Sequence, residues 1–349
     1  MTQLHNTNNK LTVVSLFSGA GGLDIAACRT GRVARLFSTD ANATFLQTTI
    51  NNIPNHFPNV VHKHIAADVK KLHGPQIIES IGTSKVDLLM GGPPCDDFTS
   101  IGRKKGFEGD KAPLVFEFSR LVNELKPRVF LFENVPSLAN MWKNVLDELV
   151  QSLKNSGYDV VVQILESQKF GVPSLRKRLF VVGFKSNEEP TAFAFPRATH
   201  GELMAESNQT YSSDLLPYVS VGDVLKDLPD NCEPTALNFN NHTARIHRPS
   251  TIEHFKTIPQ GIQVKKSYRY RAPWDGPSHS LTAGMDSSTK SYIHPIYHRE
   301  MSVREYARIH GFPDTWIFSG TRSNGLKQVA NAVPVLLAES VLRSIINFI

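Results

Sequence analysis

Cysteine is scarce in this sequence, which has only three cysteines among its 349 residues. Cys28, Cys95 and Cys232 lie far apart and are odd in number, which argues against the disulfide framework of small secreted domains. We therefore expect the chain to work in a reducing compartment. A thiol could then serve as a nucleophile instead of a cross-link.

Long apolar runs are also missing. No stretch approaches the roughly 18 consecutive apolar residues that a membrane-spanning helix needs. The polar N-terminus MTQLHNTNNK lacks the apolar segment of a signal peptide, and we expect it to be a flexible tail. The thirteen histidines, among them His62 and His64, lack the clustered spacing of a zinc site, so we expect no metal.

An excess of one charge is present but small. The chain carries 38 basic and 32 acidic residues, a formal charge of +6, and 40% of its residues are hydrophobic. Such a length and composition suit two unequal domains with a sizeable core. The mild positive charge permits an anionic partner such as nucleic acid without requiring one.

Short apolar runs alternate with amphipathic segments from Leu11 to about Phe184. The runs predict strands, and the segments VFEFSRLVNELK and NVLDELVQSLKNSG predict helices. This alternation is typical of an α/β fold with a doubly wound, mainly parallel sheet. The apolar runs are LTVVSLF, RVARLFST, VDLLMGG, RVFLFENV, YDVVVQIL and RLFVVGF.

The composition changes after about residue 185, where Pro, Ser, Thr, Asn, His and Tyr become frequent. We interpret this part as a second, smaller and irregular domain. A compact region returns with MSVREYARIHGFPDTW and ends in a helical segment. The expected organisation is a tail at 1–10, a catalytic domain at 11–185, a small domain at 186–321, and a segment at 322–349 that returns to the catalytic domain.

A glycine-rich turn, SGAGG, follows the first predicted strand and precedes a helix. Gly19, Gly21 and Gly22 would let the backbone approach a nucleoside-based cofactor, although a tight packing turn is an equally good interpretation of the glycines alone. Asp40 and Asp68 follow at the ends of the next two strands. Ligands of such sheets bind outside the carboxyl ends of the strands, where these acids could meet ribose hydroxyls and an adenine amino group.

The segment GGPPC places Cys95 at the end of another predicted strand. Paired glycines and prolines impose an unusual backbone, which a cysteine used only for packing does not need, so Cys95 is a candidate nucleophile. Glu133 ends the apolar strand RVFLFEN, where burial would raise its pKa and let it share a proton. Arg176 and Arg178 alternate along an extended segment and could hold a phosphate or a base carbonyl.

Taken together, these blocks resemble the cytosine-C5 DNA methyltransferases of the bacterial modification type. The resemblance covers roughly residues 11–185 and 300–340, with the region between them in the place of the target-recognition region. It implies a sheet of the S-adenosylmethionine-dependent methyltransferase type. The blocks that carry it are LFSGAGGLD, Asp40, Asp68, GGPPCDDFT, FENV, VPSLRKR, VREYARIHGFP and QVANAVP.

The resemblance also assigns roles to residues. Cys95 would attack carbon 6 of a flipped-out cytosine, Glu133 would meet N3, and Arg178 with Arg176 nearby would hold O2 and the flanking phosphates. The methyl group would come from S-adenosylmethionine. Its site would be lined by Phe17, Gly19, Ala20, Gly21, Gly22, Leu23, Asp40, Ala41, Asp68, Val69, Pro93, Leu114, Asn331, Ala332 and Val333.

Three positions depart from the family pattern. Asp96 stands where Gln is usual and is followed by Asp97; two carboxylates beside a thiol would raise its pKa and repel the DNA backbone. Thr99 replaces a common Ser, and Ser174 replaces a common Gln.

The resemblance implies double-stranded DNA as the partner, bound by a monomer, with a restriction endonuclease as a possible second partner. It also implies the cytoplasm of a bacterial or archaeal cell, near the nucleoid. The segment KKSYRYR interleaves cations with tyrosines, which suits phosphates and base edges. The residues expected to touch DNA are Thr99, Arg103, Lys265, Lys266, Tyr268, Arg269 and Arg271.

Three other functions would share some of these sequence features. A tRNA cytosine-C5 methyltransferase shares the catalytic blocks and the Thr at position 99, but the Cys-Phe-Thr tripeptide of that group is absent here. A non-catalytic DNA-binding protein on the same scaffold would explain Asp96 and Asp97 but not the retained Cys95 and Glu133. A nicotinamide dehydrogenase would share the glycine turn but would not need GGPPC.

Overall fold

The computed structural model describes residues 10–94, 113–186, 193–202, 214–230, 239–243, 245–264, 269–282 and 291–349. The chain forms two compact units, each considered below by itself. The sheet unit comprises Met1–Leu165, Lys177–Pro196 and Ala338–Ile349. The second unit comprises Glu166–Arg176 and Arg197–Leu337.

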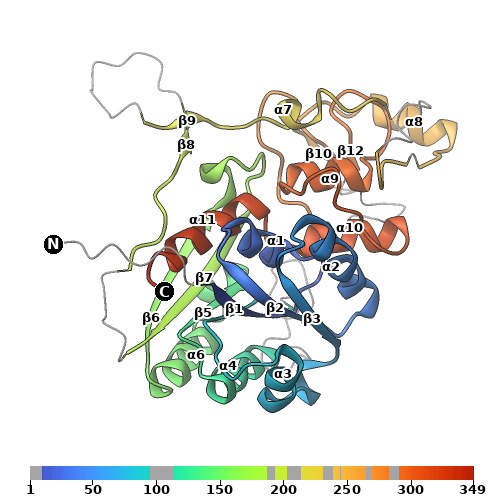
Figure 1. Cartoon of the computed structure of the whole chain (residues 1–349). Helices are drawn as coiled ribbons and strands as arrows, with labels where there is room; N and C mark the ends of the chain where they lie inside the picture. The colour runs from blue at the N-terminus through green and yellow to red at the C-terminus, as the bar shows by residue number, and fades with distance from the viewer. Residues whose placement is uncertain are drawn as a thin grey trace, which may run out of the picture. The chain divides into compact units, whose positions relative to one another are not determined.

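A seven-stranded sheet forms the centre of the sheet unit, in the order β3-β2-β1-β4-β5-β7-β6 (Figure 1). The strands from β3 to β5 pair in parallel, and β7 pairs with β5 in the antiparallel direction. This order confirms the doubly wound, mainly parallel sheet predicted from the sequence. The strands are β1 Leu11–Leu16, β2 Val33–Asp40, β3 Val61–Ala66, β4 Leu88–Gly91, β5 Val129–Asn134, β6 Tyr158–Glu166 and β7 Lys177–Lys185.

Helices cover both faces of this sheet (Figure 1). One layer holds α1, α2 and α11, and the other holds α3, α4 and α6. Strands β1, β4 and β5 are buried along their whole length, as expected of parallel strands that are covered on both sides. The helices are α1 Gly22–Arg29, α2 Ala43–His56, α3 Gly74–Ile81, α4 Pro113–Leu125, α5 Ser137–Asn140, α6 Lys143–Asn155 and α11 Val335–Ile346, with a short 3₁₀ turn η1 at Val69–Lys71.

The two helices predicted from amphipathic spacing are both present, as α4 and α6. Helix α6 buries Val145, Leu146, Leu149 and Leu153, a spacing of three or four residues that forms one apolar stripe. It ends before Gly157, whose φ of 87° lies in the left-handed region that stops a helix. The helix therefore stops within the Asn-Ser-Gly sequence that closes the predicted segment.

Aromatic side chains fill the core between α4, β5 and β6. Phe118 meets Phe130 and Phe132 edge to face, with centroids 6.1 and 5.3 Å apart, and Phe130 meets Tyr158 at 5.2 Å. Such pairs are worth about 0.5–1.5 kcal/mol each beyond the area they bury. This packing holds the strand that ends at Glu133.

The second unit is built from short elements. Its three-stranded sheet has the order β10-β11-β12, and β8 pairs with β9. The elements are η3 Ser167–Phe170, β8 His200–Gly201, β9 Leu216–Pro217, α7 Val221–Leu225, α8 Pro249–Lys256, β10 Gln263–Val264, β11 Arg269–Arg271, β12 Ser291–Ile293, α9 Val303–Ile309 and α10 Arg322–Asn331.

The block VREYARIHGFP organises the second unit from inside. Arg304 on α9 is fully buried and donates to the carbonyls of Asn240, Pro313 and Trp316. Helix α9 begins with a capping box in which Ser302 and Glu305 exchange hydrogen bonds with each other's backbone N–H. The block is therefore a scaffold within this unit.

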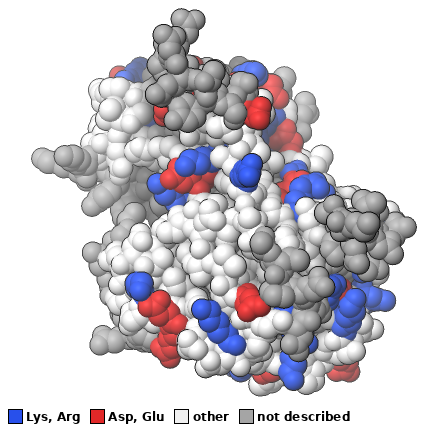
Figure 2. Space-filling model, turned by 90° about the vertical axis from the view of Figure 1, so that its left-hand side faces the viewer, with Lys and Arg blue, Asp and Glu red and all other residues white. Residues whose placement is uncertain are grey.

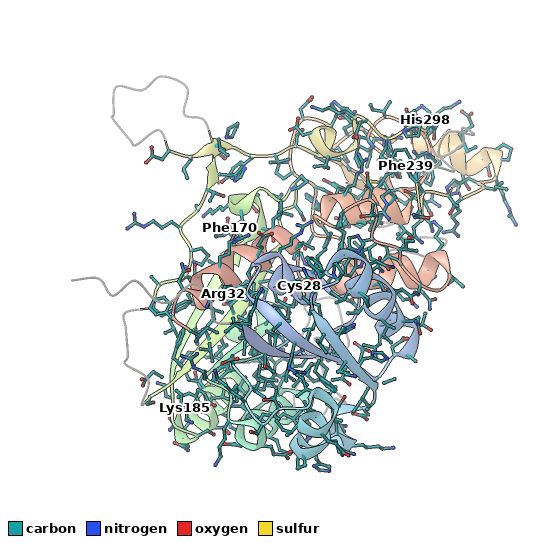
Figure 3. The ribbon with its side chains drawn as sticks, in the orientation of Figure 1. Cys28, Arg32, Phe170, Lys185, Phe239 and His298 are labelled. Atoms are coloured by element: carbon teal, nitrogen blue, oxygen red, sulfur yellow. The ribbon has the colours of Figure 1, made fainter. Side chains whose placement is uncertain are left out.

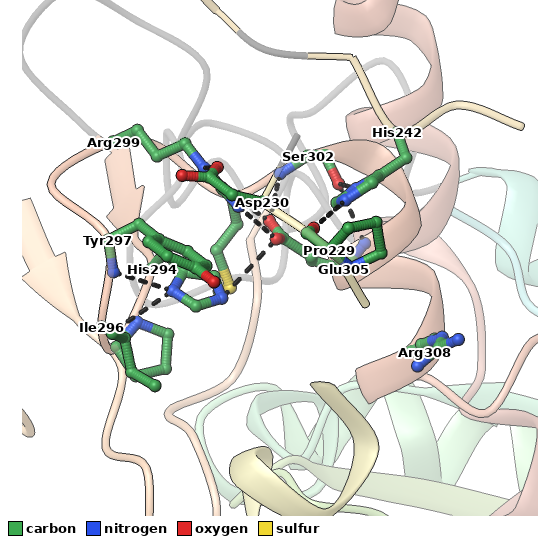
Figure 4. Close-up of polar contacts among 12 residues, drawn as sticks. Pro229, Asp230, His242, His294, Ile296, Tyr297, Arg299, Ser302, Glu305 and Arg308 are labelled. Atoms are coloured by element: carbon green, nitrogen blue, oxygen red, sulfur yellow. Dashed lines mark hydrogen bonds and ion pairs between the residues drawn. The ribbon is translucent and has the colours of Figure 1, made fainter. Parts of the chain in front are cut away.

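A buried polar network extends from that cap (Figure 4). Arg299 pairs with Glu305 at 2.8 Å and with Asp230 at 2.7 Å. His294 lies 3.6 Å from Glu305, and burial lowers the His294 pKa to about 4, so the imidazole is neutral at physiological pH. Its Nδ1 accepts from two backbone N–H groups, which directs the Nε2–H toward the carboxylate.

The boundaries of the units differ from the domain limits expected from the sequence. Phe193 and Phe195 belong to the sheet unit because Phe193 packs on Phe184 and Phe348, with ring centroids 5.0 and 5.6 Å apart. Residues 166–176 belong to the second unit, and the return to the sheet unit begins at Ala338, not at 322.

Residues Arg322–Ile346 are helical for most of their length and apolar enough to cross a membrane by length and composition alone. However, 67% of the apolar 18-residue stretch within this segment is buried inside the protein, as in a core helix. We therefore interpret this segment as core.

Candidate active site

The carboxyl ends of β1, β2 and β3 lie next to one another, because these strands are parallel neighbours. The ends of β4 and β5 continue the same edge of the sheet. Most sequence-predicted residues of the sheet unit follow directly on these five strand ends. The structure thus brings them to one edge, on both sides of the point where the strand order reverses between β1 and β4.

The glycine turn after β1 has a left-handed backbone at three residues. Phe17, Gly19 and Gly21 have φ values of 55°, 53° and 82°. A non-glycine residue in this region costs on the order of 1–3 kcal/mol, a strain that clusters at ligand sites. Phe17 is half-buried, and the four residues that follow Gly19 are buried: Ala20, Gly21, Gly22 and Leu23.

Asp40 holds this turn. Its Oδ2 accepts the Gly19 N–H at 2.9 Å, and its Oδ1 accepts the Asn42 N–H at 2.8 Å. Burial raises the Asp40 pKa from its ordinary value. The side chain is only partly buried, so each oxygen keeps a lone pair for a ribose hydroxyl, whereas the next residue, Ala41, is exposed.

Asp68 lies beyond the end of β3 and is exposed. Its Oδ1 accepts the Lys70 N–H at 3.0 Å and so caps η1. The second carboxylate oxygen, Oδ2, takes no part in this cap. Val69 is buried, and Leu114 on α4 packs against the same core. The glycine turn, two partly available carboxylates and apolar neighbours fit a nucleoside-based cofactor.

Sequence reasoning missed Arg120 on α4, which supports the Asp68 segment. Its guanidinium donates to the carbonyls of Val69 and Leu72 at 2.8 and 2.9 Å, and pairs with Glu117 and Glu124. Two carbonyls of the turn after Asp68 are thereby fixed. Only tertiary contact reveals this role, since the sequence shows an ordinary helical arginine.

The two glycines of GGPPC have separate structural reasons. A side chain on Gly91 would approach the Leu16 carbonyl oxygen to 2.9 Å, where β4 lies against β1. A side chain on Gly92 would approach Glu133 Oε2 to 2.6 Å. Pro93 is buried, and its carbonyl accepts from Asn134 Nδ2 at 3.3 Å. Gly92 and Pro93 thus lie against Glu133 and Asn134 at the end of β5.

Glu133 and Arg178 form an ion pair at this strand end. Arg178 Nε lies 2.7 Å from Glu133 Oε1, and both side chains are about nine-tenths buried, with relative exposures of 11% and 8%. The facing guanidinium offsets the burial of the carboxylate. The two residues meet because Arg178 is the second residue of β7, which runs antiparallel beside β5 and begins near its end. Sequence reasoning predicted both residues but not their pairing.

Arg176 lies elsewhere than expected, in the second unit, and is only 3% exposed. Its terminal nitrogens donate to the carbonyls of Leu281, Ala330 and Ala332 at 2.8, 2.6 and 3.3 Å. Three backbone acceptors thus occupy the terminal nitrogens that were expected at cytosine O2 or a phosphate. The contacts correct that expectation and indicate a role in backbone positioning.

The cofactor residues expected in the NAV segment also belong to the second unit. Asn331 is exposed, Ala332 is half-buried and Val333 is 5% exposed. Helix α10 ends at Asn331, and two of the three carbonyls that Arg176 binds, those of Ala330 and Ala332, flank this residue.

Arg271 also differs from its expected role as a DNA contact. It is 3% exposed, and its guanidinium donates to the carbonyls of Phe255, Ile258, His294, Pro295 and Tyr297. A side chain enclosed in this way does not reach DNA. Tyr270 is also buried and stacks on His279, whereas Arg269 is half-buried with its guanidinium 5.3 Å from the centre of the Phe255 ring.

Several predicted residues lie outside the described part of the chain: Cys95, Thr99, Arg103, Lys265, Lys266 and Tyr268. The same holds for Asp96 and Asp97. Cys28, shown on α1 in Figure 3, is buried and free, and burial raises its pKa, which makes it a poor nucleophile. Within the described ranges no group of three His, Cys, Asp or Glu side chains could hold a metal ion.

One face of the molecule shows how charge is distributed. In Figure 2 the described basic and acidic side chains lie interspersed, and neither sign forms a continuous field. This matches the small net charge of +6. Strong attraction to a phosphate backbone needs clustered cations, and the described side chains on this face do not supply a continuous basic patch.

Comparisons with known proteins agree with this geometry. A family model described as C-5 cytosine-specific DNA methylase matches residues 11–347. The Type II methyltransferase M.SacI of Streptomyces achromogenes is 30% identical, over 97% of this chain and 94% of that protein. The Type II methyltransferase M.NgoFVII of Neisseria gonorrhoeae is also 30% identical, over 98% and 89%. A putative DNA modification methyltransferase encoded within an E. coli prophage has the same fold, with a TM-score of 0.75 at 24% identity over 97% and 99% of the two chains.

Proposed function

Because the chain belongs to the C-5 cytosine-specific DNA methylase family, we propose that Cys95, Glu133 and Arg178 carry out its reaction. That reaction transfers a methyl group from S-adenosylmethionine to carbon 5 of cytosine in DNA, in the setting of restriction and modification. The observation that carries the assignment is the buried Glu133–Arg178 pair, 2.7 Å apart, next to the GGPP backbone that leads into Cys95.

The turn from Phe17 to Leu23 holds the cofactor, together with Asp40, Ala41, Asp68 and Val69. S-adenosylmethionine supplies an electrophilic methyl group on a sulfonium. The half-exposed carboxylate of Asp40 binds the ribose hydroxyls, and the Asp68 carboxylate binds the adenine amino group. The resemblance also assigns Pro93, Leu114, Asn331, Ala332 and Val333 to cofactor binding.

The protein residues activate the cytosine ring. The Cys95 thiolate forms a bond to carbon 6, which breaks the aromaticity and moves electron density to carbon 5. The Glu133 carboxyl hydrogen-bonds N3, and the Arg178 guanidinium binds O2, so the charge that develops in the ring is stabilised. After methylation, loss of the carbon 5 proton to a base restores the double bond and expels the thiolate.

The target base is stacked inside duplex DNA and must be flipped out before the thiol can reach it, at a cost of a few kcal/mol. The second unit supplies recognition. Its contacts come from Arg269 and from Lys265, Lys266 and Tyr268, with Thr99 and Arg103 near the flipped base. Arg176 and Arg271 support the backbone instead.

The test uses purified protein, labelled S-adenosylmethionine and plasmid DNA. We expect 5-methylcytosine at one short sequence, mapped by sequencing, and none with Cys95→Ser. DNA with 5-fluorocytosine at the mapped site should trap a covalent complex that survives denaturation, because fluorine cannot leave as a proton does. Methylation of tRNA alone, or an active Cys95→Ser variant, would refute the proposal.

We further propose that the enzyme acts as a cytoplasmic monomer and protects its site from a cognate restriction endonuclease. The names of the Type II relatives support this setting. Light scattering of the DNA complex should give one protein per site, and methylated DNA should resist the partner nuclease.

A further inference from the structure

Asp24 is fully buried in the first turn of α1, directly after the glycine turn. Its two carboxylate oxygens accept from two serines, Ser15 Oγ at 2.9 Å and Ser38 Oγ at 2.6 Å. These serines face each other across β1 and β2, which pair in parallel. One carboxylate therefore clamps the two strands whose ends carry the turn and Asp40.

The clamp reaches the turn through Ser18. The Ser18 hydroxyl lies 3.2 Å from Ser15 Oγ and 3.1 Å from the Ser15 carbonyl, and it accepts the Thr39 N–H at 3.1 Å. Main-chain bonds join Ser18 to Thr39 and to Gly21 at 2.9 and 2.8 Å. Gly19 is then held by Asp40. An unbroken chain of hydrogen bonds thus links Asp24 to the turn.

His62 on β3 closes the other end of the cluster. Ser38 has one hydroxyl hydrogen, which goes to Asp24, so Ser38 Oγ must accept the bond from His62 Nε2 at 3.0 Å. Burial lowers the His62 pKa to about 4, and the ring is therefore neutral with its proton on Nε2. The cluster contains one carboxylate and no cation that would offset its burial.

Packing alone does not call for this carboxylate. Burial raises the Asp24 pKa to about 6, which means that the folded state disfavours its charge. The contacts of Asp24 suggest a role in positioning, because the two serines that donate to it lie one residue before the end of β1 and two residues before the end of β2.

We propose that Asp24 is a positioning residue for the cofactor, acting through Ser15, Ser18 and Ser38 on the turn that binds S-adenosylmethionine. This rests on the proposed role of that turn. Asp24 itself touches no reacting atom. The two serines donate to different oxygens of this carboxylate. An amide in its place has an NH2 group at one of these positions, which cannot accept a hydrogen bond, so one hydroxyl must turn away and the turn loosens.

The experiment measures the dissociation constants of S-adenosylmethionine by calorimetry and of plasmid DNA fragments by filter binding, at pH 8. Asp24→Asn and Ser15→Ala should each weaken cofactor binding about tenfold and leave DNA binding within twofold. The unfolding midpoint of Asp24→Asn should not fall. Asp87→Asn is the matched control. Asp87 is equally buried and accepts the Thr12 N–H at the opposite end of β1, so cofactor binding should not change.

Asp40→Ala tests whether the turn is the cofactor site, separately from the positioning role of Asp24. If it weakens cofactor binding while Asp24→Asn and Ser15→Ala do not, the turn is the cofactor site and the role of Asp24 is wrong. If it leaves cofactor binding intact, the assignment of the turn falls. Equal effects of Asp24→Asn and Asp87→Asn on cofactor binding and stability would show a structural role only and overturn the inference.

Discussion

Replacing Gly92 by alanine should impair catalysis while leaving the fold intact. The new methyl group would lie 2.6 Å from Glu133 Oε2, and 3.4 Å is where ordinary contact begins, so the carboxylate must move by about 0.8 Å. That movement stretches the 2.7 Å bond to Arg178 and displaces the group proposed to meet cytosine N3. A misplacement of about 1 Å can cost on the order of 100-fold in rate.

The assay is single-turnover methylation of plasmid DNA with saturating cofactor. We expect the rate for Gly92→Ala to fall about 100-fold, with DNA and cofactor affinities unchanged. Two further glycines serve as controls. Gly91→Ala, which presses on the Leu16 carbonyl between β4 and β1, should lower stability, and Gly276→Ala, which meets nothing within 4 Å, should be silent. A folded Gly92→Ala variant with the normal rate would refute the role of Glu133 and its close approach to the loop.

Three other predictions follow from buried polar groups. Arg271→Met leaves five carbonyls without their donor and should destabilise the protein by about 3–5 kcal/mol in urea unfolding; a stable variant with weakened DNA binding would favour a DNA contact instead. Arg176→Met should speed hydrogen exchange at residues 330–333, whereas the exposed Lys177→Met should not; unchanged exchange would contradict the positioning role. Because the Asp24 pKa is raised to about 6 from 3.8, the folded state holds an extra proton between those values. Wild-type stability should therefore fall relative to Asp24→Asn by about 2 kcal/mol as pH rises from 4 to 7, with Asp40, Cys28 and His62 as the titratable neighbours; a pH-independent difference in urea midpoints would contradict it.

The positions of Arg176 and Arg271 differ from expectation for the same physical reason. Arg176 and Arg271 were expected to bind nucleic acid because cations are usually solvated and attract phosphate. Both are buried, and each donates to several backbone carbonyls of segments distant in sequence. An arginine that satisfies carbonyls inside an irregular unit has the same local sequence as one that faces DNA. Residue type and alternation therefore could not distinguish them.

Local sequence determined the sheet, its helices and the positions of the strand-end residues. Apolar runs of seven or eight residues that alternate with amphipathic helices are typical of strands in a parallel sheet, and the glycines and acids after them lie at one edge because parallel strands end together. The positive φ values at Gly19 and Gly21 confirm a turn that the glycines alone made possible. The order of motifs was also enough to indicate the family, and the family model confirmed it.

Tertiary structure decided which side chains pair. Glu133 meets Arg178 because β7 runs antiparallel beside β5, a register that no local pattern contains. Asp24 joins two serines from different strands, and Gly92 is required because a carboxylate from another strand lies against it. Hydrogen bonds and steric contacts depend on positions within a few tenths of an ångström. Sequence sets which groups are present at the strand ends, and packing alone sets which of them touch.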